Sequence, residues 1–259
     1  MQNQMRVPPA VGAQSRNWMD SLATSVRALD LKLGTIYSHL VNRRVVHSVG
    51  RLLAALLFAF ILIGKWQAVT RLVGTNRIPV DDFTTWSVVI NDVLQIPFLG
   101  LAVLLVIARR QPRTGTWRFS GLLAALGGTV APSFLVYQSN AGMHSTFAPL
   151  SVVLMLVGMG FAIWSLAALG RCFSVVPEVR GLVTSGPYRW VRHPIYLGEI
   201  TATLGVLLPI ISVINVAIVL LFCGLQLWRT RYEEAGLAAT FPEYSDYQRR
   251  TTRLLPGLW

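Results

Sequence analysis

The chain has 259 residues, of which 53% are hydrophobic and only 13% are charged, and its mean hydropathy is +0.53. Soluble domains carry about 25% charged residues, so this composition excludes an ordinary soluble protein and indicates an integral membrane protein. The net charge of +12 comes from 21 arginines and only two lysines, and because the arginines lie between apolar runs, membrane topology explains them better than nucleic-acid binding does.

Residues 1–48 predict an N-terminal cytoplasmic segment with an amphipathic helix. Apolar residues recur every three or four positions from Trp18 to Leu40, and arginines flank this stripe. A helix of this kind lies in the membrane interface, attracted to anionic lipids, or packs on a partner or on the body of the protein. We favour the interface. No apolar stretch follows Met1 that would make a cleavable signal peptide.

Crossing a membrane takes about 20 mostly apolar residues, and four runs qualify: roughly 50–70, 87–108, 119–138 and 148–170. A fifth run, 195–228, contains Pro209 near its middle. Proline removes a backbone donor and interrupts a helix, so this run predicts a tight helical hairpin. The predicted fold class is an all-α integral membrane protein with four full transmembrane helices, a C-terminal helical hairpin and a cytoplasmic tail.

The arginines predict which helix ends face the cytoplasm. They crowd the link between the second and third runs, whereas the link between the third and fourth runs has no Arg or Lys. By the positive-inside rule, the amino terminus and the arginine-rich tail after residue 228 are both cytoplasmic. The chain then divides into the segment 1–48, transmembrane helices over 49–165, and a core with the hairpin and tail over 166–259.

Two charged residues, Lys65 and Asp92, fall inside apolar runs, where charges are costly. They either pair across neighbouring helices or reach the interface along their apolar stems. Small residues in the third run indicate close helix packing. Cys172 and Cys223 show neither metal-ligand spacing nor a disulfide framework, so we expect no metal site.

The stretch GPYRWVRHPIYLGE, Gly186–Glu199, places cationic and aromatic residues directly before the hairpin. Pro194 suits the first turn of a helix. The positive end of that helix would lie beside Arg192 and His193, where it could hold a carboxylate or a phosphate.

The return arm of the hairpin leads to Glu233 and Glu234, so acidic and cationic groups from distant segments meet at one membrane surface. A zwitterionic ligand would be complementary to such a site. Alternatively, the two glutamates simply pair with the arginines as interfacial charges.

The stretch Gly186–Gly198 resembles the signature of the isoprenylcysteine carboxyl methyltransferase family and, more loosely, that of the phospholipid N-methyltransferases. The later parts follow in the same order: a hairpin, the Glu-Glu pair, an aromatic tail over Phe241–Tyr247 in which Pro242 replaces the usual glycine, and a final Pro256. The resemblance covers roughly residues 165–259. It implies a membrane-embedded enzyme that uses S-adenosylmethionine and holds it between the hairpin and the cytoplasmic tail.

The ligand implied by the resemblance is zwitterionic, as the charges of the stretch suggest. We expect Arg192, His193 and the helix start to hold the carboxylate, Glu233 or Glu234 to hold the ammonium or the ribose hydroxyls, and tyrosines to stack on adenine or face the sulfonium. The expected cofactor-binding residues are Tyr188, Arg192, His193, Pro194, Tyr196, Leu197, Gly198, Glu233, Glu234 and Tyr244.

The expected catalytic residues are Arg192, Arg231 and Glu233. Methyl transfer from a sulfonium needs mainly proximity and orientation, and Arg229 and Arg231 could steer an anionic acceptor. Both arginines could equally hold the exit of the hairpin at the lipid headgroups.

Two other functions compete with methyl transfer. Membrane sterol-type reductases use a similar R-H-P-x-Y-x-G-E stretch, whose last position Glu199 fits, and would imply NADPH, but their later Arg-Asp-Glu pattern is absent here. A non-catalytic membrane scaffold is the other. We expect methyl transfer to a lipophilic acceptor at the cytoplasmic face of a bacterial inner membrane. The acceptor is left open between an isoprenoid carboxylate, a phospholipid amine, a quinone and another small hydrophobic molecule.

Overall fold

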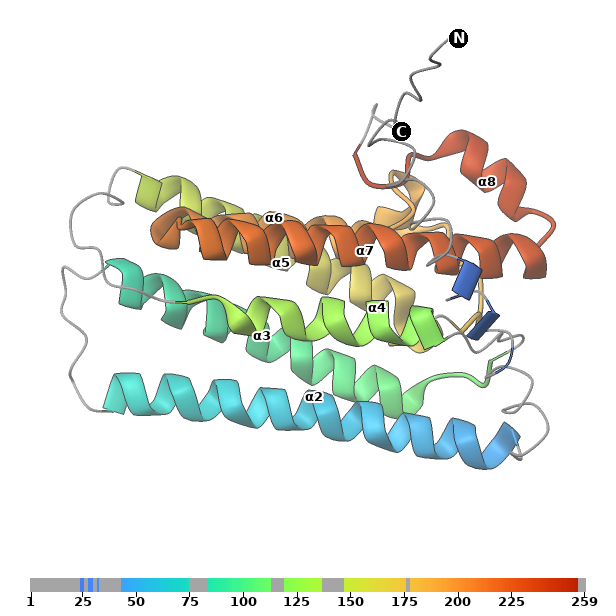
Figure 1. Ribbon diagram of the computed structural model, residues 1–259, viewed down its shortest axis with the longest axis horizontal. Coiled ribbons are helices and arrows are strands. Elements are labelled where there is room, and N and C mark those ends of the chain that lie inside the picture. Colours follow the sequence, from blue (N-terminus) through green and yellow to red (C-terminus); the bar gives the residue numbers. More distant parts are fainter. Residues whose placement is uncertain are drawn as a thin grey trace, which may run out of the picture.

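The computed structural model describes residues 24, 25, 28, 29, 32, 43–74, 83–112, 119–136, 147–175 and 178–255. In these residues the chain is a bundle of α-helices whose long axes run roughly side by side (Figure 1). The helices are α2 (Arg43–Gly74), α3 (Phe83–Ala108), α4 (Phe119–Val130), α5 (Ala148–Leu169), α6 (Pro194–Leu207), α7 (Val213–Thr240) and α8 (Tyr244–Arg250). The all-α class is therefore confirmed. The amphipathic helix predicted from Trp18 to Leu40 lies almost wholly outside the described residues.

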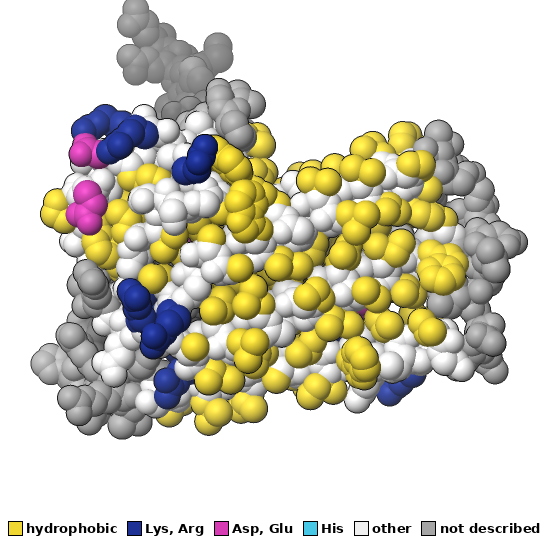
Figure 2. Space-filling view, turned by 180° about the vertical axis from the view of Figure 1, so that it is seen from behind, with side chains coloured by type: hydrophobic (Ala, Val, Ile, Leu, Met, Phe, Trp, Pro, Cys, Tyr) yellow, Lys and Arg dark blue, Asp and Glu magenta, His cyan; other side chains and the backbone are white. Residues whose placement is uncertain are grey.

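The described residues include four helices that are long and apolar enough to cross a membrane: Ser48–Gly74, Thr85–Ala108, Ala148–Cys172 and Val213–Thr240. Large apolar side chains on their outer faces are exposed, for example Phe60 at 77% and Val213 at 88%. Figure 2 shows hydrophobic side chains over the band of helices, while most of the visible charged side chains gather at the end that carries α8. An apolar belt with a charged end is the surface of a protein that lies in a bilayer.

The third predicted span is shorter than expected. α4 ends at Val130, and a 3₁₀ turn, Ala131–Phe134, follows with Pro132 in its first turn. Proline cannot donate the next helical hydrogen bond, so the helical part of this apolar run ends at Phe134. The fourth long helix is instead α7, the return arm of the predicted hairpin.

The hairpin forms around Pro209 as predicted. α6 ends at Leu207, a 3₁₀ turn covers Leu208–Ile210, and Ser212 caps the next helix by accepting a hydrogen bond from the backbone N–H of Asn215 at 3.2 Å. The hairpin is asymmetric, because α6 has 14 residues and α7 has 28. The extra turns of α7 keep Glu233 and Glu234 on the helix.

Helices α5 and α6 pack closely through glycines. A methyl group at Gly158 would lie 2.4 Å from the backbone nitrogen of Ala202, and one at Gly198 would lie 2.6 Å from the carbonyl oxygen of Gly158. Contacts this short leave no room for a side chain at either glycine. Gly198, predicted to contact the cofactor, thus lies against α5, and this close contact fixes the direction of α6.

This packing predicts the effect of one added methyl group. Gly158→Ala should destabilise the detergent-solubilised protein by about 1–3 kcal/mol, because backbone atoms of α6 cannot move aside as a flexible side chain could. Gly160→Ala is the matched control, because a methyl group at Gly160 would meet nothing within 4 Å. The measurement is the apparent melting temperature of both variants, and equal values for the two would contradict the close packing.

The two charges inside the apolar runs form a pair. Lys65 of α2 and Asp92 of α3 lie 2.6 Å apart, Nζ to Oδ1, and Asp92 is buried. Pairing reduces the cost of burying each charge, so the prediction of an ion pair across neighbouring helices is confirmed.

Candidate active site

The signature stretch folds into a short turn that leads into α6. Gly186, at a positive φ of 61°, starts a 3₁₀ turn over Gly186–Arg189, and α6 begins at Pro194 as predicted. The C-terminal tail pairs with the residues between these elements. The backbone N–H of Arg192 donates to the carbonyl of Thr252 at 2.9 Å, and that of His193 donates to the carbonyl of Arg253 at 3.1 Å. The tail therefore closes directly over the start of α6.

Glu234 binds three cations at this end of the bundle. Its Oε1 lies 2.7 Å from Arg192 Nε and 3.3 Å from His193 Nε2, and its Oε2 lies 2.6 Å from Arg253 Nη2. Glu234 is only 5% exposed. The same Arg192 also donates to the backbone carbonyls of Gln248 and Thr251. Charge-assisted hydrogen bonds of this kind are about twice as strong as neutral ones, so Glu234 ties α6, α7 and the tail together.

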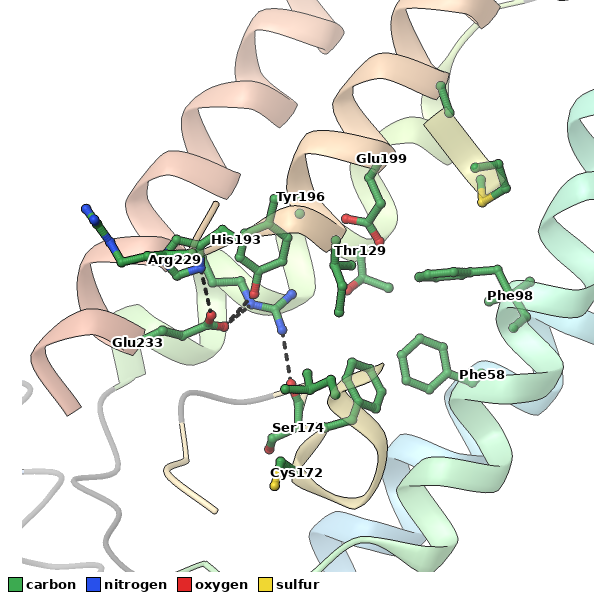
Figure 3. A pocket seen from close by; sticks show the side chains of 18 of the residues that line it. Phe58, Phe98, Thr129, Cys172, Ser174, His193, Tyr196, Glu199, Arg229 and Glu233 are labelled. Atoms are coloured by element: carbon green, nitrogen blue, oxygen red, sulfur yellow. Dashed lines mark hydrogen bonds and ion pairs between the residues drawn. The ribbon is translucent and has the colours of Figure 1, made fainter. Parts of the chain in front are cut away.

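Glu233, the residue before Glu234 on α7, forms a second cluster of polar contacts. Its Oε1 accepts hydrogen bonds from the hydroxyl of Tyr196 and from Arg229 Nε at 3.0 Å, and its Oε2 lies 3.5 Å from His193 Nδ1. The guanidinium of Arg229 also lies over the Tyr196 ring, 5.0 Å from its centroid, and donates to the carbonyl of Ser174 at 3.2 Å. Figure 3 shows these side chains converging from α6, α7 and the chain after α5.

His193 is held between the two glutamates. Burial by itself lowers the pKa of His193, but the hydrogen bonds and charges of Glu233 and Glu234 outweigh burial and raise that pKa above its ordinary value of 6.5. The imidazole ring also stacks on Tyr196, with ring centroids 5.6 Å apart and an angle of 9° between the planes. The two glutamates therefore favour the protonated form of the His193 ring.

A group of tyrosines covers the tail side of the cluster. The Tyr247 hydroxyl donates to the backbone carbonyl of Tyr188 at 2.6 Å. The Tyr244 side chain is fully buried, and within the described part of the chain its hydroxyl has no hydrogen-bond partner. Burial raises the pKa of both Tyr188 and Tyr244, so both present neutral rings and hydroxyls to their surroundings.

We name the six charged or ionisable side chains of these two clusters the charged lip: Arg192, His193, Arg229, Glu233, Glu234 and Arg253. A cavity of about 230 Å³ begins at the lip and continues between the helices. Its inner walls are largely apolar and come from α2, α3, α4, α5, α6 and α7; among the lining residues are Phe58, Phe98, Leu99, Met159, Val206 and Phe222. Figure 3 shows Phe58 and Phe98 on the wall opposite His193 and Arg229.

The structure brings most of the predicted site residues to this cavity. Six of them line it: Tyr188, Arg192, His193, Tyr196, Glu233 and Tyr244. Pro194 and Leu197 belong to the first turn of α6 without lining the cavity, and Gly198 packs on α5. Glu234 belongs to the charged lip but does not line the cavity. Arg231, predicted to be catalytic, is exposed and does not line the cavity, since α7 turns it away from Arg229.

Sequence reasoning missed several cavity residues. Glu199 lines the cavity and appeared in the sequence only as a feature of a competing family. Ser174 and Phe173, in the segment after α5, fall within the stretch that the resemblance covers but were not predicted as site residues. The aromatic residues of α2 and α3 are ordinary membrane-helix residues by composition, and only packing brings them to the cavity.

The fold and the charged lip define a membrane-embedded helical protein with a cavity whose polar end lies at one end of its bundle. Residues 147–243 match a family model described as phospholipid methyltransferase. This match confirms the resemblance for that part of the chain, which carries the sequence of a membrane methyltransferase family and includes α5, α6, α7 and most of the lip.

Two curated relatives are similar over part of the chain. The cobalt-zinc-cadmium resistance protein CzcN of Cupriavidus metallidurans is 32% identical over 155 residues, which cover 56% of this chain and 64% of the relative. The nickel-cobalt-cadmium resistance protein NccN of Alcaligenes xylosoxydans xylosoxydans is 32% identical over 114 residues, which cover 42% of this chain and 53% of the relative. The matched residues thus span about half to two thirds of these relatives.

Proposed function

We propose that the protein transfers a methyl group from S-adenosylmethionine to a lipophilic acceptor at the membrane surface. The observation that supports this most is a single cavity with two chemical ends. One end is the charged lip, which suits a polar, zwitterionic donor. The other end lies among apolar side chains inside the bundle, which suits a lipophilic acceptor. The family match over residues 147–243 supports methyl transfer as the chemistry that joins them.

The lip has more cationic than anionic groups. Three arginines face two glutamates, and His193 lies between the glutamates. This surplus suits the carboxylate of a methionine moiety, while Glu233, which is less buried than Glu234, suits its ammonium group. Glu234 is engaged by three cations, so its role in this proposal is to hold the lip in shape.

The rings around the lip suit the remaining parts of the donor. Tyr188, Tyr196 and Tyr244 line the cavity beside the charges, and aromatic faces bind both adenine and a sulfonium cation. When bound, S-adenosylmethionine supplies a methyl group that is already activated. The chain therefore has mainly to hold the donor and the acceptor in line, and fixed geometry of this kind accounts for large rate gains.

The orientation follows from the arginines. Arg110 and Arg171 belong to separate links, yet the backbone N–H of Arg110 donates to the carbonyl of Arg171 at 2.9 Å, and Arg180 donates to the carbonyl of Arg110. The arginine-rich ends of α3 and α5 thus meet at the end that carries the lip. By the positive-inside rule, this end faces the cytoplasm, with both termini, in the inner membrane of a bacterium.

Titration calorimetry with the detergent-purified protein tests the donor. S-adenosylhomocysteine should bind and NADPH should not. Glu233→Gln and His193→Ala should each weaken S-adenosylhomocysteine binding about 10-fold, because each removes a charged contact from the lip. Glu243→Gln is the matched control, because Glu243 is exposed and lies off the cavity.

Each other outcome has a definite meaning. Binding of NADPH in place of S-adenosylhomocysteine would assign the protein to the reductase-like alternative. Binding of neither compound would leave the lip as an interfacial anchor and contradict the proposal.

A further inference from the structure

Glu199 is an acidic side chain inside the cavity that the proposed donor site does not use. It lies on α6, three residues after Tyr196 and six after His193. At a rise of 1.5 Å per residue, this places it about 9 Å further into the bundle than His193. In the view of Figure 3 its carboxylate lies between His193 and Phe98, and Thr129 of α4 also lines the cavity. Glu199 therefore stands where the polar and apolar parts of the cavity meet.

One contact fixes the orientation of this carboxylate. Oε2 of Glu199 accepts a hydrogen bond from Nε2 of Gln226, which is only 1% exposed on α7. The nearby Arg229 is directed to Glu233 and to the carbonyl of Ser174. In the described part of the chain, no cation lies within ion-pair distance of Glu199. Lys65, which also lines the cavity, pairs with Asp92.

An acidic side chain without a cationic partner is costly within a membrane protein, and such residues are functional by default. A carboxylate at this position would repel an acceptor that also carries a carboxylate. It would instead accept a hydrogen bond, and then a proton, from a nucleophilic atom that bears hydrogen. The position of Glu199 thus discriminates among the acceptors that methyl transfer allows.

We propose that Glu199 accepts the proton of the acceptor's nucleophilic atom, so that the acceptor is an amphiphile with an amine, thiol or phenol group and not a carboxylate. This inference rests on the proposed methyl transfer. The lone pair of the nucleophile forms a bond to the methyl carbon while the carbon–sulfur bond breaks, and the sulfur leaves as a neutral thioether. The proton of the nucleophile passes to Glu199, and bulk water later removes it from the carboxyl group.

The test offers the purified protein four single-chain probes together with S-adenosylmethionine labelled in its methyl group. Dodecylamine, dodecanethiol and 4-dodecylphenol carry the protic nucleophiles, and N-acetyl-S-farnesylcysteine carries a carboxylate. We expect label on at least one protic probe and none on the carboxylate. Glu199→Gln should lower kcat for that probe by about 100-fold or more and change S-adenosylhomocysteine binding by less than about 3-fold. Glu199→Asp should retain more activity than Glu199→Gln, and Glu243→Gln should match the wild type.

The outcomes separate this inference from the function on which it rests. Failure of the wild type to bind S-adenosylhomocysteine removes the proposed function and the inference with it. Where binding is intact, label on the carboxylate probe, label on none of the protic probes, or an unchanged kcat in Glu199→Gln overturns the role of Glu199 alone. The selectivity of the wild type among the probes needs no variant, so it decides the matter even if a Glu199 variant does not fold.

Discussion

Arg229→Ala is expected to weaken S-adenosylhomocysteine binding by about 100-fold, whereas Arg231→Ala, two residues further along α7, is expected to change it by less than about 2-fold. Arg229 is buried and holds both Glu233 and the face of Tyr196. Without Arg229, Glu233 would lose its ion-pair partner on α7, and the lip would lose a positive charge. Arg231 is exposed on the outer side of the same helix.

The measurement is titration calorimetry of both variants under identical conditions, with the apparent melting temperature as a check on folding. Arg229→Lys should recover part of the affinity, because it keeps the charge but loses the planar guanidinium over the ring. A larger loss in Arg231→Ala than in Arg229→Ala would restore the assignment predicted from the sequence. It would also contradict the placement of these side chains on α7.

Glu234→Gln is expected to have the largest effect on stability, a loss of roughly 3 kcal/mol. The change leaves Arg192, Arg253 and His193 close together without the carboxylate that they share. Breaking a buried ion pair is costly because the remaining charges stay desolvated. For a chain of this size, the expected fall in apparent melting temperature is on the order of 10 °C.

A double variant distinguishes charge balance from lost hydrogen bonding. Glu234→Gln combined with Arg253→Gln should cost less than the sum of the two single changes, since it removes a cation together with its counter-charge. Glu243→Gln, on the exposed surface, should leave the melting temperature unchanged. Additive losses in the double variant would contradict an energetic coupling between Glu234 and Arg253.

The sequence was most informative where a local rule decides the structure. Pro194 starts α6 because proline suits the first helical turn, and the apolar run around Pro209 forms a hairpin because proline interrupts a helix. Lys65 and Asp92 pair because neither charge is tolerated alone among apolar side chains. Each of these features depends on residue type and neighbouring residues.

The sequence could not predict features in which the direction of a side chain depends on packing. Arg229 and Arg231 are equivalent by composition and spacing, and only the rotation of α7 turns one toward the cavity and the other away. Gly198 packs on α5, a contact that its position in the motif does not reveal. The short third span could have been recognised from Pro132, which lies within the run that the hydropathy pattern extended to residue 138.

Glu233 and Glu234, the two residues of the acidic pair, have different surroundings in the structure. The carboxylate of Glu234 is engaged by arginines, as an interfacial charge would be, while Glu233 lines the cavity, as a binding residue would. Adjacent positions on a helix point about 100° apart. The two adjacent glutamates can therefore have different surroundings, although the Glu-Glu motif in the sequence makes them look equivalent.

The residues that line the cavity come from two parts of the chain, one that matches the methyltransferase family model and one that lies outside the match. Residues 147–243, which match the methyltransferase family, contribute most of the charged lip, whereas Phe58, Phe98 and Thr129 on the inner wall lie outside that match. A change in α2, α3 or α4 can reshape the inner wall without altering a residue of the lip. Under the proposed function, this architecture would allow related proteins to differ in the molecules that they accept while the methyl-transfer chemistry stays the same. It makes α2, α3 and α4 the natural region to exchange in chimeric proteins.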